Sequence, residues 1–142
     1  TYALDMREIA PMGTVEFDGV KYTALPCTHA AGTYGYLIET DDTRMFYASD
    51  TGKLPPETYE QLQDIDILAM DATFWKNNWS PAAHHSVQEC IEEGLSLNAG
   101  KIYLTHLCMH YDEPITLVEL EEFLKQYEGR VEAARDGLTF EI

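Results

Sequence analysis

Short apolar runs separated by turn-forming residues fill the first fifty positions of the chain. Val20, Tyr22 and Ala24 recur at every second position, which is the spacing of a strand with one buried face. The pair Asp18-Gly19 separates this run from the one before it and is a strong signal for a two-residue hairpin turn. The pattern therefore predicts a β-meander, with strands at residues 14–17, 20–25, 34–39 and 45–49.

From residue 55 onward, the pattern alternates between helical and strand spacing. Ser86 with Glu89, and Thr116 with Glu119, carry the capping-box signature of a helix start. The expected helices are residues 57–63, the segment after Ser86 and the segment after Thr116. Their expected buried stripes are Val87, Cys90, Ile91, Gly94 and Leu95, and Leu117, Leu120, Phe123, Leu124 and Tyr127. The remaining expected strands are residues 65–70 and 101–105, then a closing hairpin of 130–133 and 138–142.

This order of elements predicts a sheet covered by helices, either α/β or a layered α+β fold. A chain of 142 residues can bury one hydrophobic core, so we expect residues 1–142 to form a single domain. No apolar run approaches the roughly 20 residues that span a bilayer, and the first residues do not resemble a signal peptide. The chain starts at Thr1 rather than at Met, so we expect the domain to be incomplete at its N-terminus.

Acidic residues dominate the charge: 25 Asp and Glu face 9 Lys and Arg, giving a formal charge of −16. Such a surface repels phosphate backbones, so direct binding of nucleic acid is a poor candidate. Bound divalent cations would offset part of the charge locally. The three cysteines are scattered and odd in number, which argues against a disulfide framework and favours a reducing, cytoplasmic compartment.

Several potential ligands follow predicted strands. Asp50 comes directly after the predicted strand 45–49, and His29 and His106 follow two other strands. Histidine and carboxylate side chains at the ends of rigid strands are suited to a metal site with an open water position. The alternative for Asp50 is that it only opens a turn, because Asp-x-Gly is common turn chemistry. For a single histidine, the alternative is an ordinary exposed or hydrogen-bonded residue.

The pair His84-His85 precedes a predicted helix N-terminus, where the helix dipole favours anions. A histidine there could steady a developing negative charge or donate a proton to a leaving group. The alternative is a solvent-exposed pair in a loop. We expect His110 to be an ordinary loop histidine. Cys27 and Cys108 lie close to proposed ligands, and we expect them to be small, buried side chains.

Four ordered segments resemble motifs of the metallo-β-lactamase superfamily, in the branch of phosphoribosyl cyclic phosphodiesterases and tRNA 3′-processing endonucleases. The resemblance covers about residues 19–142. The first segment is Thr28-His29 before the GYLIE run 35–39, and the second is Ser49-Asp50-Thr51. The third is Asp71-Ala72-Thr73-Phe74 with His84-His85-Ser86, and the fourth is Leu104-Thr105-His106.

One signature of that superfamily is absent: no H-x-H-x-D-H occurs in the sequence. The resemblance therefore implies the C-terminal half of an αββα sandwich, with the first half on another segment or chain. It implies two divalent metal ions, Zn²⁺ or Mn²⁺, with His29 on one, His106 on the other and Asp50 between them. It also implies that His84, rather than His85, is the catalytic histidine.

The first functional hypothesis is a metal-dependent hydrolase that cleaves a small phosphodiester by metal-activated hydroxide and needs the missing N-terminal half for activity. The alternative is a metal-free structural or partner-binding half-domain, which would expose an apolar sheet face to a partner. A nuclease that processes nucleic acid is a third possibility, and the negative charge disfavours it. No membrane partner is expected, and a homo-oligomer is left open.

Overall fold

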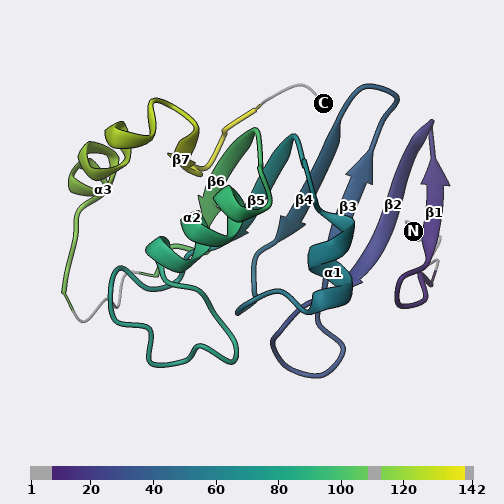
Figure 1. The fold of residues 1–142 in the computed structure, drawn as a ribbon, viewed down its shortest axis with the longest axis horizontal. Coiled ribbons are helices and arrows are strands. Elements are labelled where there is room, and N and C mark those ends of the chain that lie inside the picture. The colour runs from purple at the N-terminus through teal and green to yellow at the C-terminus, as the bar shows by residue number, and fades with distance from the viewer. Residues whose placement is uncertain (1–7, 109–112, 140–142) are drawn as a thin grey trace, which may run out of the picture.

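The computed structural model describes residues 8–108 and 113–139. Within them a sheet of 7 strands follows the order of the chain from β1 to β7 (Figure 1). The strands are β1 (Thr14–Phe17), β2 (Val20–Pro26), β3 (Tyr34–Glu39), β4 (Arg44–Ala48), β5 (Ile67–Asp71), β6 (Lys101–Thr105) and β7 (Val131–Ala133). The helices are α1 (Pro56–Gln61), α2 (Val87–Ser96), α3 (Leu117–Leu124) and the short 3₁₀ helix η1 (Lys125–Tyr127).

The sheet changes from antiparallel to parallel pairing at β4. Strands β1 to β4 pair antiparallel, whereas β4, β5, β6 and β7 pair parallel through helical crossovers. Since β2 is separated from β4 by two antiparallel pairings, both strands run in the same direction. The carboxyl ends of β2, β4, β5 and β6 therefore share one edge of the sheet, which is where open α/β sheets place their ligands.

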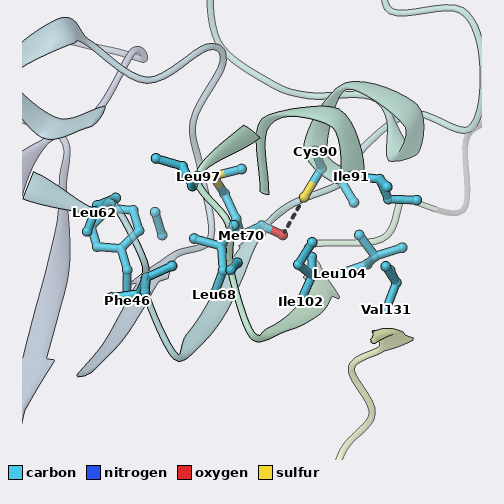
Figure 2. Close-up of a cluster of buried hydrophobic side chains, with 14 of the residues drawn as sticks. Phe46, Leu62, Leu68, Met70, Cys90, Ile91, Leu97, Ile102, Leu104 and Val131 are labelled. Carbon is cyan, nitrogen blue, oxygen red and sulfur yellow. Dashed lines mark hydrogen bonds between the residues drawn. The ribbon is translucent and has the colours of Figure 1, made fainter. Parts of the chain in front are cut away.

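The hydrophobic core lies between the sheet and its helices, with α3 contributing Leu120 and Leu124. The helices α1 and α2 lie in front of the strands in Figure 1. Fully buried side chains of β5 and β6 lie under α2, and Figure 2 shows the thiol of Cys90 on this helix pointing at the backbone carbonyl oxygen of Met70 in β5. Burial of each large apolar side chain contributes about 1.5–3 kcal/mol. Gly94 lets α2 approach closely, because a Cβ there would lie 2.6 Å from Cδ1 of Ile102. The α2 crossover thus fixes β5 beside β6.

The opposite face of the sheet carries a row of cross-strand neighbours that we call the tyrosine row: Ala24, Tyr36, Tyr47, Ala69 and Tyr103. Alternation along each strand turns these side chains away from Phe46 and Leu68, which pack under the helices. Tyr36 and Tyr47 remain 41% and 43% exposed. This face therefore offers aromatic surface to solvent.

Most predicted elements are confirmed, including the four-stranded meander and both capping boxes. The first helix is shorter than predicted and ends at Gln61, while β5 begins only at Ile67 and continues to Asp71. Leu95 and Leu117 were wrongly expected in buried stripes: both are exposed, because each lies at the rim of its helix face.

The predicted closing hairpin is tested only in part. Its first strand is confirmed as β7, which pairs in parallel with β6 after the α3 crossover, and residues 138–139 form no strand. The end of the predicted second strand, residues 140–142, lies outside the described residues. Among the described residues, no helix has both the length and the apolar character needed to cross a membrane.

Candidate functional site

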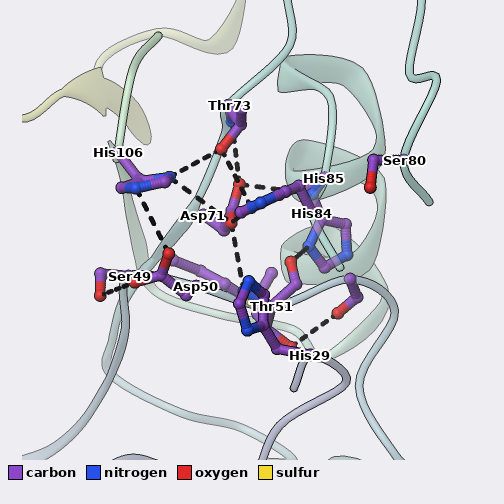
Figure 3. Close-up of polar contacts among 12 residues, drawn as sticks. His29, Ser49, Asp50, Thr51, Asp71, Thr73, Ser80, His84, His85 and His106 are labelled. Carbon is purple, nitrogen blue, oxygen red and sulfur yellow. Dashed lines mark hydrogen bonds and ion pairs between the residues drawn. The ribbon is translucent and has the colours of Figure 1, made fainter. Parts of the chain in front are cut away.

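Four potential ligand side chains gather at the shared carboxyl edge of the strands (Figure 3). Asp50, Asp71, His84 and His106 each offer one ligand atom, and these atoms lie within 4.8 Å of one another. Three of them follow or end the strands β4, β5 and β6, and His84 stands before α2. The fold thus joins residues that are distant in sequence into one polar cluster.

Asp50 and His106 are delivered by the ends of β4 and β6. The hydroxyl of Ser49 donates to Oδ2 of Asp50 over 2.7 Å and leaves Oδ1 turned toward His106. His106 has a left-handed backbone with φ of 55°, which a non-glycine residue adopts at a cost of about 1–2 kcal/mol. This bend turns the chain at the end of β6, and Nε2 of the His106 ring lies 3.3 Å from Oδ1 of Asp50.

Asp71 is wholly buried and accepts hydrogen bonds from several directions. Its Oδ2 accepts from the Nδ1–H of His84 at 2.7 Å and from the backbone N–H of Thr51 at 3.1 Å. Its Oδ1 accepts from the backbone N–H groups of Thr73 at 2.9 Å and His85 at 3.3 Å. These donors compensate for the loss of solvent around the carboxylate. Asp71 therefore joins the loops after β4 and β5 to the segment before α2.

The hydroxyl of Thr73 lies between two imidazoles. It is 2.8 Å from Nδ1 of His106 and 3.3 Å from Nδ1 of His84, and the two rings stack with centroids 5.4 Å apart. Since His84 already donates from Nδ1 to Asp71, its Nε2 is the nitrogen left for other chemistry. The same hydroxyl can accept from the Nδ1–H of His106, which leaves the lone pair of Nε2 in that ring directed toward Asp50.

His29 lies at the same edge but outside the cluster of four. Its ring packs edge-on against that of His84, with centroids 5.0 Å apart, and its Nδ1 lies 3.4 Å from the hydroxyl of Thr33. The structure thus brings Asp50, His84 and His106 together and places His29 beside His84. The assigned roles of these four residues stay predictions. His110 lies outside the described residues.

Solvent exposure was the wrong alternative for His85. Its ring is buried: Nδ1–H donates to the carbonyl oxygen of Thr51 over 2.8 Å, and Nε2 lies 2.9 Å from Oε2 of Glu93. Sequence reasoning assigned no site role to Asp71 or Thr73, and it did not pair His85 with Glu93. The signal for Asp71 and Thr73 was present, because they stand in the third motif, directly after an apolar strand. Glu93 had no such signal within a helix that contains several acids.

Two cysteines near the site are held as thiols. Burial raises the pKa of Cys27 and outweighs the hydrogen bonds with Thr51 and Gly35, which lower the pKa, and the nearby Asp50 charge adds a smaller rise. Burial, with the charges of Asp71 and Glu93, raises the pKa of Cys90 well above its usual value. Neither side chain is set up as a thiolate ligand at neutral pH. Cys27 and Cys108 were expected to be buried, and each is only half-buried.

The residues present fit a divalent cation. Two ligands of one tetrahedral zinc ion, each about 2.0–2.1 Å from the metal, lie about 3.4 Å from each other. The 3.3 Å between Nε2 of His106 and Oδ1 of Asp50 matches that separation. Mixed imidazole and carboxylate donors suit zinc and manganese. Asp71 is saturated by N–H donors, so within this set it acts as an orienting carboxylate more readily than as a ligand.

Comparison with known proteins gives consistent matches. Residues 2–107 match the family model described as a beta-lactamase superfamily domain. The chain is 34% identical over 92 residues to ribonuclease Z from Pyrobaculum neutrophilum, covering 56% of this chain and 32% of that protein. It is 29% identical over 103 residues to ribonuclease Z from Myxococcus xanthus, covering 70% and 33% of the two chains. The chain spans about a third of the length of these curated relatives.

Solved structures share the fold. A diphosphatase of the PhnP family superposes with a TM-score of 0.71 at 27% identity, covering 91% of this chain and 46% of that chain. The metallo-beta-lactamase fold protein YhfI from Bacillus subtilis superposes with a TM-score of 0.76 at 19% identity, covering 94% and 54%. At that identity, the second match supports the fold alone.

Proposed function

Because the chain belongs to the beta-lactamase superfamily, whose domain its residues 2–107 match, we propose that it supplies half of the active site of a metal-dependent hydrolase. The expected resemblance to the tRNA-processing branch of that superfamily is confirmed by the ribonuclease Z relatives. The single observation that carries the proposal is the convergence of Asp50, Asp71, His84 and His106 at one edge of the sheet.

The proposed reaction is hydrolysis of a small phosphodiester. The names of the similar proteins, ribonuclease Z and diphosphatase, both describe cleavage at phosphorus. The formal charge of −16 disfavours a long RNA backbone and favours a small substrate. A cavity of about 690 Å³ borders His84, the one member of the cluster of four that lines it, and its wall holds Leu54, Tyr59 and Pro81 together with three glutamates of the α2 helix. Such a volume suits a small molecule.

Asp50 and His106 would hold one divalent cation, and His29 would approach a second from the neighbouring strand end. Zn²⁺ or Mn²⁺ bound there would supply Lewis acidity at the phosphoryl oxygen and a lowered pKa for water. Asp50 gives a carboxylate whose second oxygen is fixed by Ser49, and Thr73 orients the ring of His106. These contacts set the direction of both ligand atoms before any cation arrives.

His84 is the proposed catalytic residue. Its Nδ1–H is fixed on Asp71, so the opposite nitrogen, Nε2, can exchange a proton with the leaving oxygen. The rings of His29 and Phe74 pack edge-on against it, with centroids 5.0 and 6.2 Å away. These neighbours restrict the imidazole to one orientation, which lowers the entropic cost of placing it beside the substrate.

The remaining ligands would come from a segment that carries H-x-H-x-D-H, on a longer form of this chain or on a partner chain. We propose that it packs on the tyrosine row, where Tyr36 and Tyr47 are exposed. The coverage of 46% and 54% of the two similar structures supports a missing part of comparable size. We also propose a cytoplasmic location, because the three cysteines are scattered and odd in number, which suits a reducing compartment.

The same exposed row favours a second candidate, a partner-binding half-domain that uses no metal. The two candidates differ at Asp50 and His106. A binding module requires the tyrosine row but neither Asp50 nor His106, whereas a hydrolase requires both of these ligands. Titration of the chain with Zn²⁺ is the simplest measurement that separates them.

The activity test is reconstitution. The chain is mixed with a polypeptide that supplies the H-x-H-x-D-H half of a ribonuclease Z relative, and bis(p-nitrophenyl) phosphate is hydrolysed with Zn²⁺ or Mn²⁺ present. We expect turnover that is lost with Asp50→Ala or His106→Ala. Asp42→Ala, in an exposed turn, is the matched control. Turnover that survives both ligand substitutions contradicts the proposed site.

A further inference from the structure

The imidazole of His85 and the carboxylate of Glu93 form a buried pair outside the ligand cluster. Their nearest atoms, Nε2 and Oε2, lie 2.9 Å apart, and their side chains are 3% and 8% exposed. A buried polar pair is costly to desolvate unless every remaining donor and acceptor is satisfied. Here each member has a further partner, and in both cases that partner belongs to the loop after β4.

The pair holds this loop at two points. The Nδ1–H of His85 donates to the carbonyl oxygen of Thr51 over 2.8 Å. The backbone N–H of Leu54 donates to both carboxylate oxygens of Glu93, at 3.2 and 3.3 Å. The loop that carries Asp50 is therefore fastened to α2 through one histidine and one glutamate.

The fastened loop is also fixed from its other side. The peptide N–H of Thr51 donates to Asp71 over 3.1 Å, so Thr51 is held at its N–H by Asp71 and at its C=O by His85. The backbone N–H of His85 reaches the same carboxylate at 3.3 Å, and His84 reaches it with its ring. Thr51 and His85 are therefore hydrogen-bonded to each other, and each is the chain neighbour of a site residue: Thr51 of Asp50, and His85 of His84.

We propose that the His85–Glu93 pair is a positioning device that holds the Asp50–Thr51 segment against the His84–His85 segment. Its consequence for cation binding rests on the proposed function. The pair does not touch the cation or the substrate. It acts through Thr51, by fixing the direction from which the Asp50 carboxylate enters the site. Mutation of residues that orient a metal ligand without binding the metal typically lowers metal affinity 10- to 100-fold.

Glu93→Ala and Glu93→Gln separate positioning from mere packing. The side-chain amide introduced by Glu93→Gln would keep an oxygen that accepts from the Leu54 N–H and would place a polar NH₂ group against Nε2 of His85, whereas Glu93→Ala would leave both without a partner. Glu92→Ala is the matched control, because Glu92 is an exposed neighbour on the same helix. A further variant, His85→Gln, keeps a donor toward Glu93 and loses the one toward Thr51.

The measurement is amide hydrogen exchange by NMR on the whole chain. In Glu93→Ala we expect exchange of the Thr51 N–H to accelerate at least about tenfold while the β6 core amides stay protected. In Glu93→Gln we expect the Thr51 N–H to exchange as slowly as in the wild type. Fast exchange at Leu54 alone, with Thr51 unchanged, overturns the proposal. If Glu93→Ala fails to fold, the same measurement is made on His85→Gln. A Thr51 amide that exchanges in this variant at the wild-type rate overturns the proposal.

Zn²⁺ titration by calorimetry on the same proteins tests the link to the site. We expect the Kd to rise about tenfold in Glu93→Ala and to stay within about twofold in Glu93→Gln and Glu92→Ala. Equal affinity in Glu93→Ala, despite a freed Thr51 amide, overturns the role in cation binding. Absence of Zn²⁺ binding by the wild type contradicts the proposed function instead, and the exchange data still decide the positioning role.

Discussion

The Nδ1–H of His84 donates to Oδ2 of Asp71 over 2.7 Å, and the Asp71 side chain is fully buried. This bond fixes the imidazole with Nε2 unengaged, so that Nε2, when it carries a proton, can donate that proton to a leaving oxygen. The same carboxylate accepts three backbone N–H groups, so it supports the fold as well as the site.

Asp71→Asn should therefore cost stability as well as activity. The volume is conserved, but the new amide NH₂ faces N–H donors and leaves at least one of them unpaired. We expect the free energy of unfolding to fall by about 2–3 kcal/mol, measured by urea denaturation. Asp41→Asn, in an exposed turn, serves as the control and should change it by less than about 0.5 kcal/mol. An unchanged midpoint for Asp71→Asn would show that the carboxylate is dispensable.

Removal of either converging ligand should weaken binding of Zn²⁺. Oδ1 of Asp50 and Nε2 of His106 are 3.3 Å apart, as two ligands of one cation would be. We expect Asp50→Ala and His106→Ala each to raise the Kd by at least about tenfold in calorimetric titration of the chain. Asp42→Ala should leave it unchanged.

His29→Ala tests whether its ring shares that coordination set. His29 packs against His84, with ring centroids 5.0 Å apart, and stands outside the cluster of four. We therefore expect a smaller rise in the Kd for Zn²⁺ than His106→Ala causes. An equal loss would place His29 in the same set as Asp50 and His106.

The start of α2 should respond to acid through Glu89. Burial acts to raise the pKa of this carboxyl, but hydrogen bonds from Asn78 and Ser86 outweigh it and lower the pKa below 4.5. A lowered folded pKa means that the ionised carboxylate stabilises the fold above about pH 4.5, and that this contribution is lost as the pH falls through the folded value.

We accordingly expect Glu89→Gln to reduce stability by about 0.5–1 kcal/mol near pH 7, a modest amount because solvent screens the partly exposed group. The difference from the wild type should shrink below about pH 4 in urea denaturation series. Glu92→Gln, on the exposed side of the helix, is the control. A difference that is constant from pH 7 to about pH 3 would argue against the ionised cap.

Cys90 should resist alkylation in the native protein. Burial, followed by the charges of Asp71 and Glu93, raises its pKa well above 9.0, and its thiol points at the carbonyl oxygen of Met70. Since the thiolate is the reactive form, iodoacetamide should modify Cys90 only after unfolding. Peptide mass spectrometry at rising urea concentrations would show this. Rapid native modification would mean that α2 opens readily.

Charged side chains on the tyrosine row should block assembly with the other half. Tyr36 and Tyr47 are more than two-fifths exposed and lie opposite each other on β3 and β4, so Tyr36→Lys with Tyr47→Glu, which pairs opposite charges, should change stability little. We expect the double variant to lose reconstituted hydrolysis and co-elution with the partner polypeptide in size-exclusion chromatography. Val118→Lys, on exposed apolar surface of α3, is the control. Unimpaired assembly would move the docking site elsewhere.

The sequence by itself determined the strands, both capping boxes and the residues that follow each strand. Alternation of apolar positions and turn chemistry are local, and so the meander over residues 14–48 and the helix start at Ser86 could be predicted. The placement of His29, Asp50 and His106 just beyond strand ends follows from the same local information.

Only the tertiary structure decided which of these side chains meet. The parallel order of β4, β5 and β6 brings Asp50 to His106 and makes Asp71 the shared acceptor. Burial of His85 on Glu93 and exposure of Leu117 depend on how α2 and α3 lie against the sheet. These are contacts between distant segments, and their free energy depends on packing and desolvation, which a periodic pattern along the chain does not encode.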